Sequence, residues 1–114
     1  MLHPPRPAPP RNIEASDFAG EALTLNWMAP RDNGGSPVTN YIVEKADAKS
    51  GGQWTKVSSY VTSCYTRVRN LVVNTDYDFR IYAENQYGIS DPATTSEPIK
   101  ARHPFDPPGA PGQV

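Results

Sequence analysis

Apolar and polar residues alternate along most of the chain with a period of two. Within residues 77–84 the odd positions are Tyr, Phe, Ile and Ala, and the even positions are Asp, Arg, Tyr and Glu. Five further runs have the inward positions Ile13 and Ala15; Leu23, Leu25 and Trp27; Tyr41 and Val43; Cys64, Thr66 and Val68; Ile99 and Ala101, and a shorter segment holds Trp54 and Val57. Such alternation is typical of strands that bury one face and expose the other. The pattern therefore predicts seven short strands.

Turn-forming residues separate these runs at regular intervals. Gly, Pro, Asn, Asp and Ser cluster in residues 17–20, 32–37, 47–52, 70–75 and 85–92. These residue types tolerate a positive φ or preset a turn. No segment shows the i, i+3, i+4 apolar spacing of a capped helix. Because isolated hairpins would leave their apolar faces in water, the strands predict an all-β sandwich of two antiparallel sheets.

Composition narrows the classes of partner. Eleven Lys and Arg against twelve Asp and Glu give a net charge of −1, which gives no electrostatic support to nucleic-acid or anionic-membrane binding. No apolar run approaches the ~18 residues of a membrane span, and the N-terminus lacks the apolar core of a signal peptide. Cys64 is the single cysteine, and no asparagine begins an N-glycosylation motif. These two features favour an intracellular protein.

No arrangement of residues points to catalysis. A reactive thiol needs a base or a cationic neighbour, but both histidines, His3 and His103, lie in the Pro-rich ends. We therefore expect Cys64 to be an inert, buried thiol. Two separated histidines and one cysteine do not assemble a zinc site, and Gly-rich phosphate-binding patterns are absent. The sequence predicts no catalytic, cofactor-binding or metal-binding residues, and hence a protein that is not an enzyme.

The strand pattern carries a more specific signature around Tyr77. The run from Leu71 to Tyr77 resembles the E–F corner of fibronectin type III domains, where the Tyr hydroxyl bonds back to nearby backbone. Residues 77–90 look like the F strand and F–G loop of that family, and Trp27 followed by Pro30 looks like the end of its B strand. The resemblance implies a seven-stranded antiparallel immunoglobulin-like sandwich.

A narrower resemblance concerns residues 32–37 and the segment 41–45 that follows them. Together they are similar to fibronectin type III modules of giant sarcomeric proteins, the group of titin, twitchin or projectin, myosin-binding protein C and myomesin. Residues 102–112 look like the linker between such modules. The resemblance implies a Pro-rich linker or residues added in cloning at 1–9, the fibronectin type III domain at 10–103, and a Pro/Gly-rich linker to a following module at 104–114.

The inward strand positions and the corner predict the centre of the structure. The expected core residues are Trp27, Tyr41, Leu71, Tyr77, Phe79 and Ile81. Trp54 lies in a weaker strand, and we expect it to pack over the edge of the sandwich, since a partly buried indole is commoner than an exposed one.

Candidate partner-binding residues lie outside this core. Arg80 and Tyr82 point outward from the longest strand, and Arg67 and Arg69 point outward from another, on the opposite sheet if the family topology holds. Such a face is either a solvated mixed-charge surface that discourages edge pairing or a polar docking strip, because Tyr and Arg are frequent in binding hot spots.

Two predicted loops supply further candidates for contact with a neighbouring module or an external partner. They are Asp32 and Asn33 in the B–C loop, and Gln86 and Tyr87 in the F–G loop.

The resemblance implies a non-catalytic structural and protein-interaction module of a cytoplasmic muscle scaffold in the sarcomere or myofibril. Expected partners are neighbouring immunoglobulin-like or fibronectin type III modules of the same chain and myosin or another sarcomeric protein, and the isolated module is expected to be monomeric. The alternative is an extracellular adhesion or receptor fibronectin type III module, although the chain has no Arg-Gly-Asp and no cystine pair. A third reading is a regulatory module beside a kinase in the same polypeptide.

Overall fold

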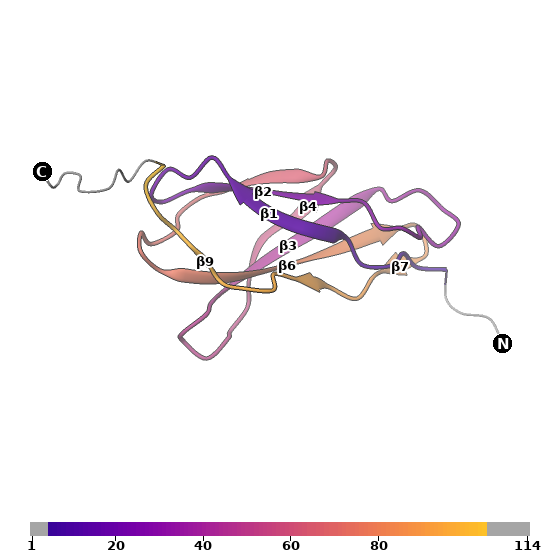
Figure 1. Cartoon of the computed structure of the whole chain (residues 1–114). Helices are drawn as coiled ribbons and strands as arrows, with labels where there is room; N and C mark the ends of the chain where they lie inside the picture. The colour runs from indigo at the N-terminus through magenta and orange to yellow at the C-terminus, as the bar shows by residue number, and fades with distance from the viewer. Residues whose placement is uncertain (1–4, 105–114) are drawn as a thin grey trace, which may run out of the picture.

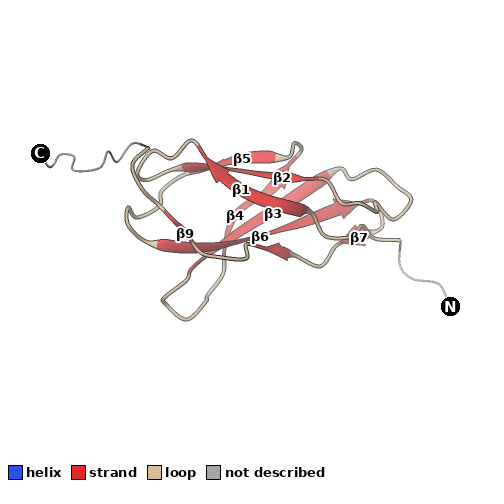
Figure 2. Cartoon of the chain, in the orientation of Figure 1, coloured by secondary structure: helices blue, strands red, loops and turns tan. Residues whose placement is uncertain are grey.

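The computed structural model describes residues 5–104, and in that range the chain forms strands and loops without helices (Figure 2). The strands are β1 (Arg11–Ser16), β2 (Leu23–Met28), β3 (Asn40–Asp47), β4 (Thr55–Val61), β5 (Tyr65–Val68), β6 (Asp76–Asn85), β7 (Gly88–Ile89), β8 (Ala93–Thr94) and β9 (Ile99–Lys100). A search of residues 5–104 for a helix long and apolar enough to cross a membrane finds none.

Two antiparallel sheets face each other (Figure 1). The first sheet has the order β1–β2–β5, and the second has the order β4–β3–β6 with β7, β8 and β9 all paired to β6. Strands β5 and β6 therefore lie in opposite sheets, so Arg67 and Arg80 lie on opposite sheets as well. The predicted all-β antiparallel sandwich is confirmed.

Three short strands follow β6 along the chain. β7, β8 and β9 have two residues each, and all pair with the long strand β6. Pro92 lies between β7 and β8, and Pro98 directly precedes β9. Because proline has no N–H to donate, it interrupts a hydrogen-bonded ladder. Only β9 falls in the last predicted run, at Ile99; β7 lies within residues 85–92, where the sequence predicts a turn, and β8 was not predicted.

The core lies between the two sheets and follows the alternation of the strands. Buried and half-buried residues alternate along all ten residues of β6. All six predicted core residues are buried, none more than 6% exposed. The Trp27 and Tyr41 rings meet edge to face across the interior, with centroids 5.3 Å apart, a favoured aromatic geometry.

The corner before β6 has the geometry that the resemblance implies. The backbone N–H of Val72 donates to the Tyr77 hydroxyl at 2.8 Å. Asn70 and Asn74 take positive φ values of 63° and 70° around this turn, and asparagine tolerates that conformation better than most residues. Tyr77 therefore packs in the core with its ring and fixes the preceding loop with its hydroxyl.

Candidate interaction surfaces

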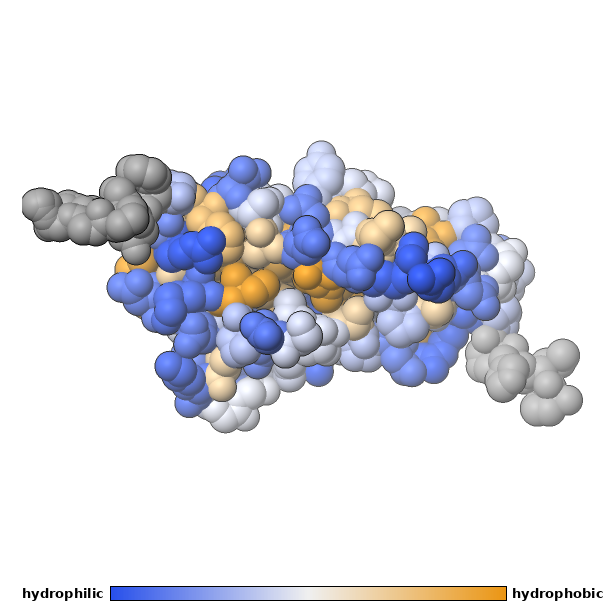
Figure 3. Space-filling view, in the orientation of Figure 1, coloured by the Kyte–Doolittle hydropathy of each residue, from blue (hydrophilic) through white to orange (hydrophobic). Residues whose placement is uncertain are grey.

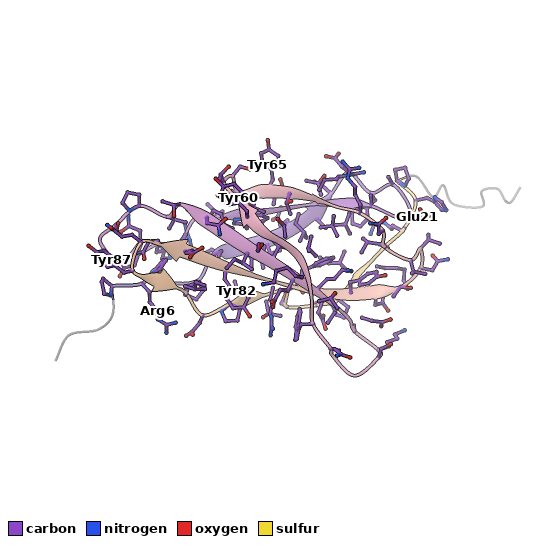
Figure 4. All side chains as sticks on the ribbon, turned by 180° about the vertical axis from the view of Figure 1, so that it is seen from behind. Arg6, Glu21, Tyr60, Tyr65, Tyr82 and Tyr87 are labelled. Atoms are coloured by element: carbon purple, nitrogen blue, oxygen red, sulfur yellow. The ribbon has the colours of Figure 1, made fainter. Side chains whose placement is uncertain are left out.

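Four of the six candidate binding residues lie in two loops at one end of the sandwich. Asp32 and Asn33 lie in the β2–β3 loop, and Gln86 and Tyr87 form the turn between β6 and β7. The Gln86 side chain donates from Nε2 to the Ser36 hydroxyl at 2.9 Å, which joins the two loops. The structure thus brings the four residues to one end of the module, where Tyr87 is 56% exposed (Figure 4).

Part of this loop end is covered by the chain itself. We call residues 5–8 the N-terminal segment. The N–H of Ala8 donates to the carbonyl of Asp32 at 2.8 Å. Arg6 donates from Nη1 to the carbonyl of Ile89 at 3.1 Å, and Pro7 is buried. The division of the chain at residue 9 remains a prediction, but residues 5–8 are in contact with the loops that follow β2 and β6.

Asn85 holds this arrangement together, and sequence reasoning did not single it out. Its Nδ2 donates to the carbonyls of Pro5 and Asn33, both at 2.8 Å. Its Oδ1 accepts the N–H groups of Tyr87 at 2.8 Å and Gly88 at 3.1 Å. The side chain is 3% exposed. Its position at a strand end, three residues before Gly88, was the available signal, since an amide can serve donors and acceptors together.

The two remaining candidates belong to a cluster on the outer face of the second sheet. Arg80 donates from Nε to Glu44 at 2.6 Å, and its guanidinium lies 4.2 Å from the centroid of the Trp54 ring. The Tyr82 hydroxyl donates to the same Glu44 carboxylate at 3.2 Å. Strand register explains the pairing, because Arg80 and Glu44 are direct partners across β3 and β6. Arg80 and Tyr82 are therefore held by Glu44 and Trp54.

The surroundings of Tyr82 favour the protonated form of its phenol. Burial raises the pKa of Tyr82 and the Glu44 carboxylate raises it further, while Arg80 acts in the opposite direction. A protonated hydroxyl is the form that can donate to Glu44. This cluster consequently presents a paired arginine and a neutral tyrosine.

Comparison with known proteins decides the family. Residues 8–101 match the family model described as the fibronectin type III domain. The chain belongs to the fibronectin type III family.

This fibronectin type III chain has relatives that are longer than itself. It is 45% identical over 89 residues to mouse Myosin-binding protein H-like, a match that covers 77% of this chain and 24% of the relative. It is 35% identical over 108 residues to human Roundabout homolog 1, covering 89% of this chain and 6% of the relative. The chain therefore spans a quarter or less of the length of these relatives.

A solved structure of titin domains A168–A170 superposes on the fibronectin type III sandwich with a TM-score of 0.78 at 36% identity, covering 86% of this chain and 33% of that chain. The predicted resemblance to fibronectin type III domains of the kind found in giant sarcomeric proteins is confirmed.

Two exposed tyrosines stand beside the turn that joins the two sheets of this fibronectin type III module. Tyr60, near the end of β4, is 74% exposed, and Tyr65, at the start of β5, is 59% exposed (Figure 4). Sequence reasoning placed Tyr65 on the outward face because it alternates with Cys64 and Thr66, but it overlooked Tyr60. Exposed aromatic side chains are enriched where proteins bind each other.

Cys64 is less buried than the strand pattern predicts. Its thiol donates to the Tyr41 hydroxyl at 3.5 Å and packs against the core, yet the residue is only half-buried. It precedes β5 and lies in the turn from β4, where one side remains open. Burial raises the pKa of Tyr41, and the contact with Cys64 adds to this effect. Within residues 5–104 no group of three His, Cys, Asp or Glu residues could hold a metal ion.

A groove of about 700 Å³ runs along the other side of the fibronectin type III sandwich, between β1 and β9. Apolar residues Ile13, Phe18 and Ile99 line it, and Figure 3 shows apolar surface between polar borders on this face. The Arg102 guanidinium covers the Phe18 ring at 3.8 Å. Charges of both signs line the groove, and Asp76 is paired with Lys100 at 3.2 Å. The groove therefore has no charge of a single sign.

Proposed function

We propose that the chain is a non-catalytic structural module, a spacer with docking surfaces, in a multidomain scaffold protein of the sarcomere. Relatives named as myosin-binding proteins and titin support this role, because they are sarcomeric scaffold proteins. The proposal places the module in the cytoplasm of muscle, within the myofibril. Its partners are neighbouring modules of the same polypeptide and myosin or another sarcomeric protein, and the module alone is a monomer.

The placement of the two ends is the observation that carries the spacer role. The described chain begins at one end of the sandwich and finishes at the opposite end (Figure 1). The starting end is tied by the N-terminal segment, residues 5–8, to the two loops described above. The finishing end is tied by the Gly20 N–H, which donates to the Arg102 carbonyl at 2.7 Å. Modules joined through such ends form a chain whose joints are constrained on both sides.

The docking role rests on surfaces at the end and on the faces of the sandwich. Asp32, Asn33, Gln86 and Tyr87 lie at the starting end, where a preceding module would meet this one. Arg80 and Tyr82 lie on a lateral face, which an external partner could reach. Repetition of modules along a filament raises local concentration, so individually weak contacts become effective.

Co-sedimentation with myosin filaments tests the docking role. A tandem of this module with its natural neighbours is expected to pellet with filaments at low salt and less at high salt, because exposed charge pairs are screened. The Tyr82→Ala variant tests the lateral face, with Tyr87→Ala as the variant at the module end. Absence of pelleting at every salt concentration would overturn myosin docking and leave the spacer role.

The second candidate, an extracellular adhesion or receptor module, is favoured by one observation, the similarity to human Roundabout homolog 1. Surface labelling of intact cells that express the full parent chain distinguishes the two. A sarcomeric protein remains unlabelled and co-localises with filaments. A labelled parent chain would replace the muscle assignment.

A further inference from the structure

A cleft of about 260 Å³ opens between the edge strands β4 and β5, on the side opposite the β1–β9 groove. Every charged residue that lines it is a cation: Lys45, Lys56, Arg67 and Arg69. These are four of the eleven Lys and Arg of a chain whose net charge is −1. The cluster therefore reflects local placement rather than an overall excess of positive charge.

The four cations of this cleft lack acidic partners. Four other cations pair with carboxylates within 4.0 Å, namely Arg6, Lys49, Arg80 and Lys100. Over residues 5–104 no carboxylate lies within that distance of the cations in the cleft. Like charges gathered in a partly enclosed space repel, and an anion that enters the cleft relieves that repulsion.

Arg67 is held in a fixed orientation at the cleft. Its Nη1 donates to the carbonyl of Asp17 at 2.6 Å and to the hydroxyl of Thr24 at 2.9 Å. The N–H groups on Nε and Nη2 have no protein acceptor in the described part of the chain. A guanidinium offers a rigid fork that matches a carboxylate, and fixing it beforehand lowers the entropic cost of binding.

Aromatic surface continues the basic cleft along β5. Tyr65 and Arg67 occupy alternate positions of β5 and so share one face, with about 7 Å between their side chains, and Arg69 follows directly after the strand. Tyr65 is 59% exposed and projects from the molecular surface (Figure 4). Tyrosine and arginine side by side are the residue types most frequent at the centres of protein interfaces.

The size and charge of the cleft select the kind of occupant. Pockets for small molecules and cofactors usually enclose about 300–1,000 Å³, more than this cleft. Nucleic-acid binders carry a broad basic surface, whereas the whole chain has a net charge of −1. We propose that the cleft binds the carboxylate side chains of an acidic segment of a partner protein, with Tyr65 packing beside it. This goes beyond the proposed function, and it does not depend on the muscle assignment.

Fluorescence anisotropy of the module with a labelled ten-residue peptide of alternating Glu and Ser tests the proposal. Saturable binding that weakens with salt is expected, and the same peptide with Gln for Glu should not bind. Arg69→Glu should weaken binding about tenfold, because it replaces a positive charge at the proposed contact with a negative one. The matched control, Arg31→Glu, makes the same charge change at an exposed arginine in the β2–β3 loop and should change affinity less than about twofold.

Amide chemical-shift mapping adds the location of binding. Shifts concentrated at Lys45, Lys56, Arg67 and Arg69 support the cleft. Equal weakening by Arg69→Glu and Arg31→Glu, or shifts outside the cleft, would overturn the assignment. Equal binding of the Gln peptide would overturn the carboxylate chemistry. Binding of an oligonucleotide or a sulfated glycan without binding of the acidic peptide would overturn the choice of partner.

Discussion

The side chain of Asn85 is expected to contribute more stability than any other polar side chain at the loop end. Its amide joins the N-terminal segment, the β2–β3 loop and the β6–β7 turn through four hydrogen bonds of 2.8–3.1 Å. Each such bond contributes about 0.5–1.5 kcal/mol net. The freed groups of the exposed Tyr87 and Asn33 regain water after substitution, which reduces the cost. We expect Asn85→Ala to lower the free energy of unfolding by about 2–3 kcal/mol.

Urea unfolding monitored by tryptophan fluorescence measures this loss, because Trp27 is buried in the core. The midpoint should fall while the slope with urea stays constant, since the surface exposed on unfolding hardly changes. Asn26→Ala is the matched control, because the Asn26 side chain makes a single hydrogen bond, to the Ser16 hydroxyl at 3.0 Å. It should cost about 1 kcal/mol. Equal losses for the two variants would refute the role assigned to Asn85.

Three further experiments test other parts of the structure. Tyr77→Phe removes the hydroxyl of the corner and should cost about 1 kcal/mol in chemical unfolding; an unchanged midpoint would contradict the corner's role. Gly34→Ala should destabilise more than Gly35→Ala by about 1 kcal/mol or more, because both have φ near +80° but only a Cβ at Gly34 overlaps the N-terminal segment; the reverse order would contradict that docking. Hydrogen bonds from lysines, Lys100 foremost, hold the pKa of Asp76 in the folded protein below its ordinary value, so the ionised carboxylate stabilises the fold. This stabilisation is fully present above the pKa of Asp76 in the unfolded chain, and it is lost as pH falls through the lower pKa of Asp76 in the folded protein. Lys100→Ala should therefore make the melting temperature less sensitive to acid between about pH 5 and pH 2, and an unchanged acid profile would count against the pairing.

The architecture was predictable because one periodicity controls both local and tertiary structure. Alternation in β2 and β6 forces one face of each strand inward, and two such faces can be buried only against each other. The corner before β6 could be recognised without knowing how the strands pair, since the spacing from Leu71 to Tyr77 is local in sequence. The short strands separated by Pro92 and Pro98 were missed, because the sequence pattern predicted only a turn at 85–92 and a last strand that includes Ile99.

The loop end was not predictable from local pattern. Asn85 contacts Pro5 across 80 residues and Asn33 across 52, and no periodicity in the sequence encodes such a contact. The same holds for the cluster on the second sheet. Alternation placed Arg80 on the outward face, but only the register with β3 shows that it lies against Glu44. The sequence therefore predicts which side chains point outward, whereas the residues that they contact depend on how the strands pair.

Paired and unpaired charges lie on different surfaces of the module, and this difference indicates different roles for those surfaces. The starting end of the module is partly occupied by its own N-terminal segment, and the finishing end is bonded to Gly20. On the second sheet Arg80 already has Glu44 as its partner. Within residues 5–104 the cations that line the cleft beside β4 and β5 have no acidic partner, so that side retains four unpaired positive charges. The two ends of the module are expected to connect it to its neighbours along the polypeptide. Selective binding of a separate protein is therefore expected on the lateral β4–β5 side, where a partner can bind without disturbing the contacts between modules.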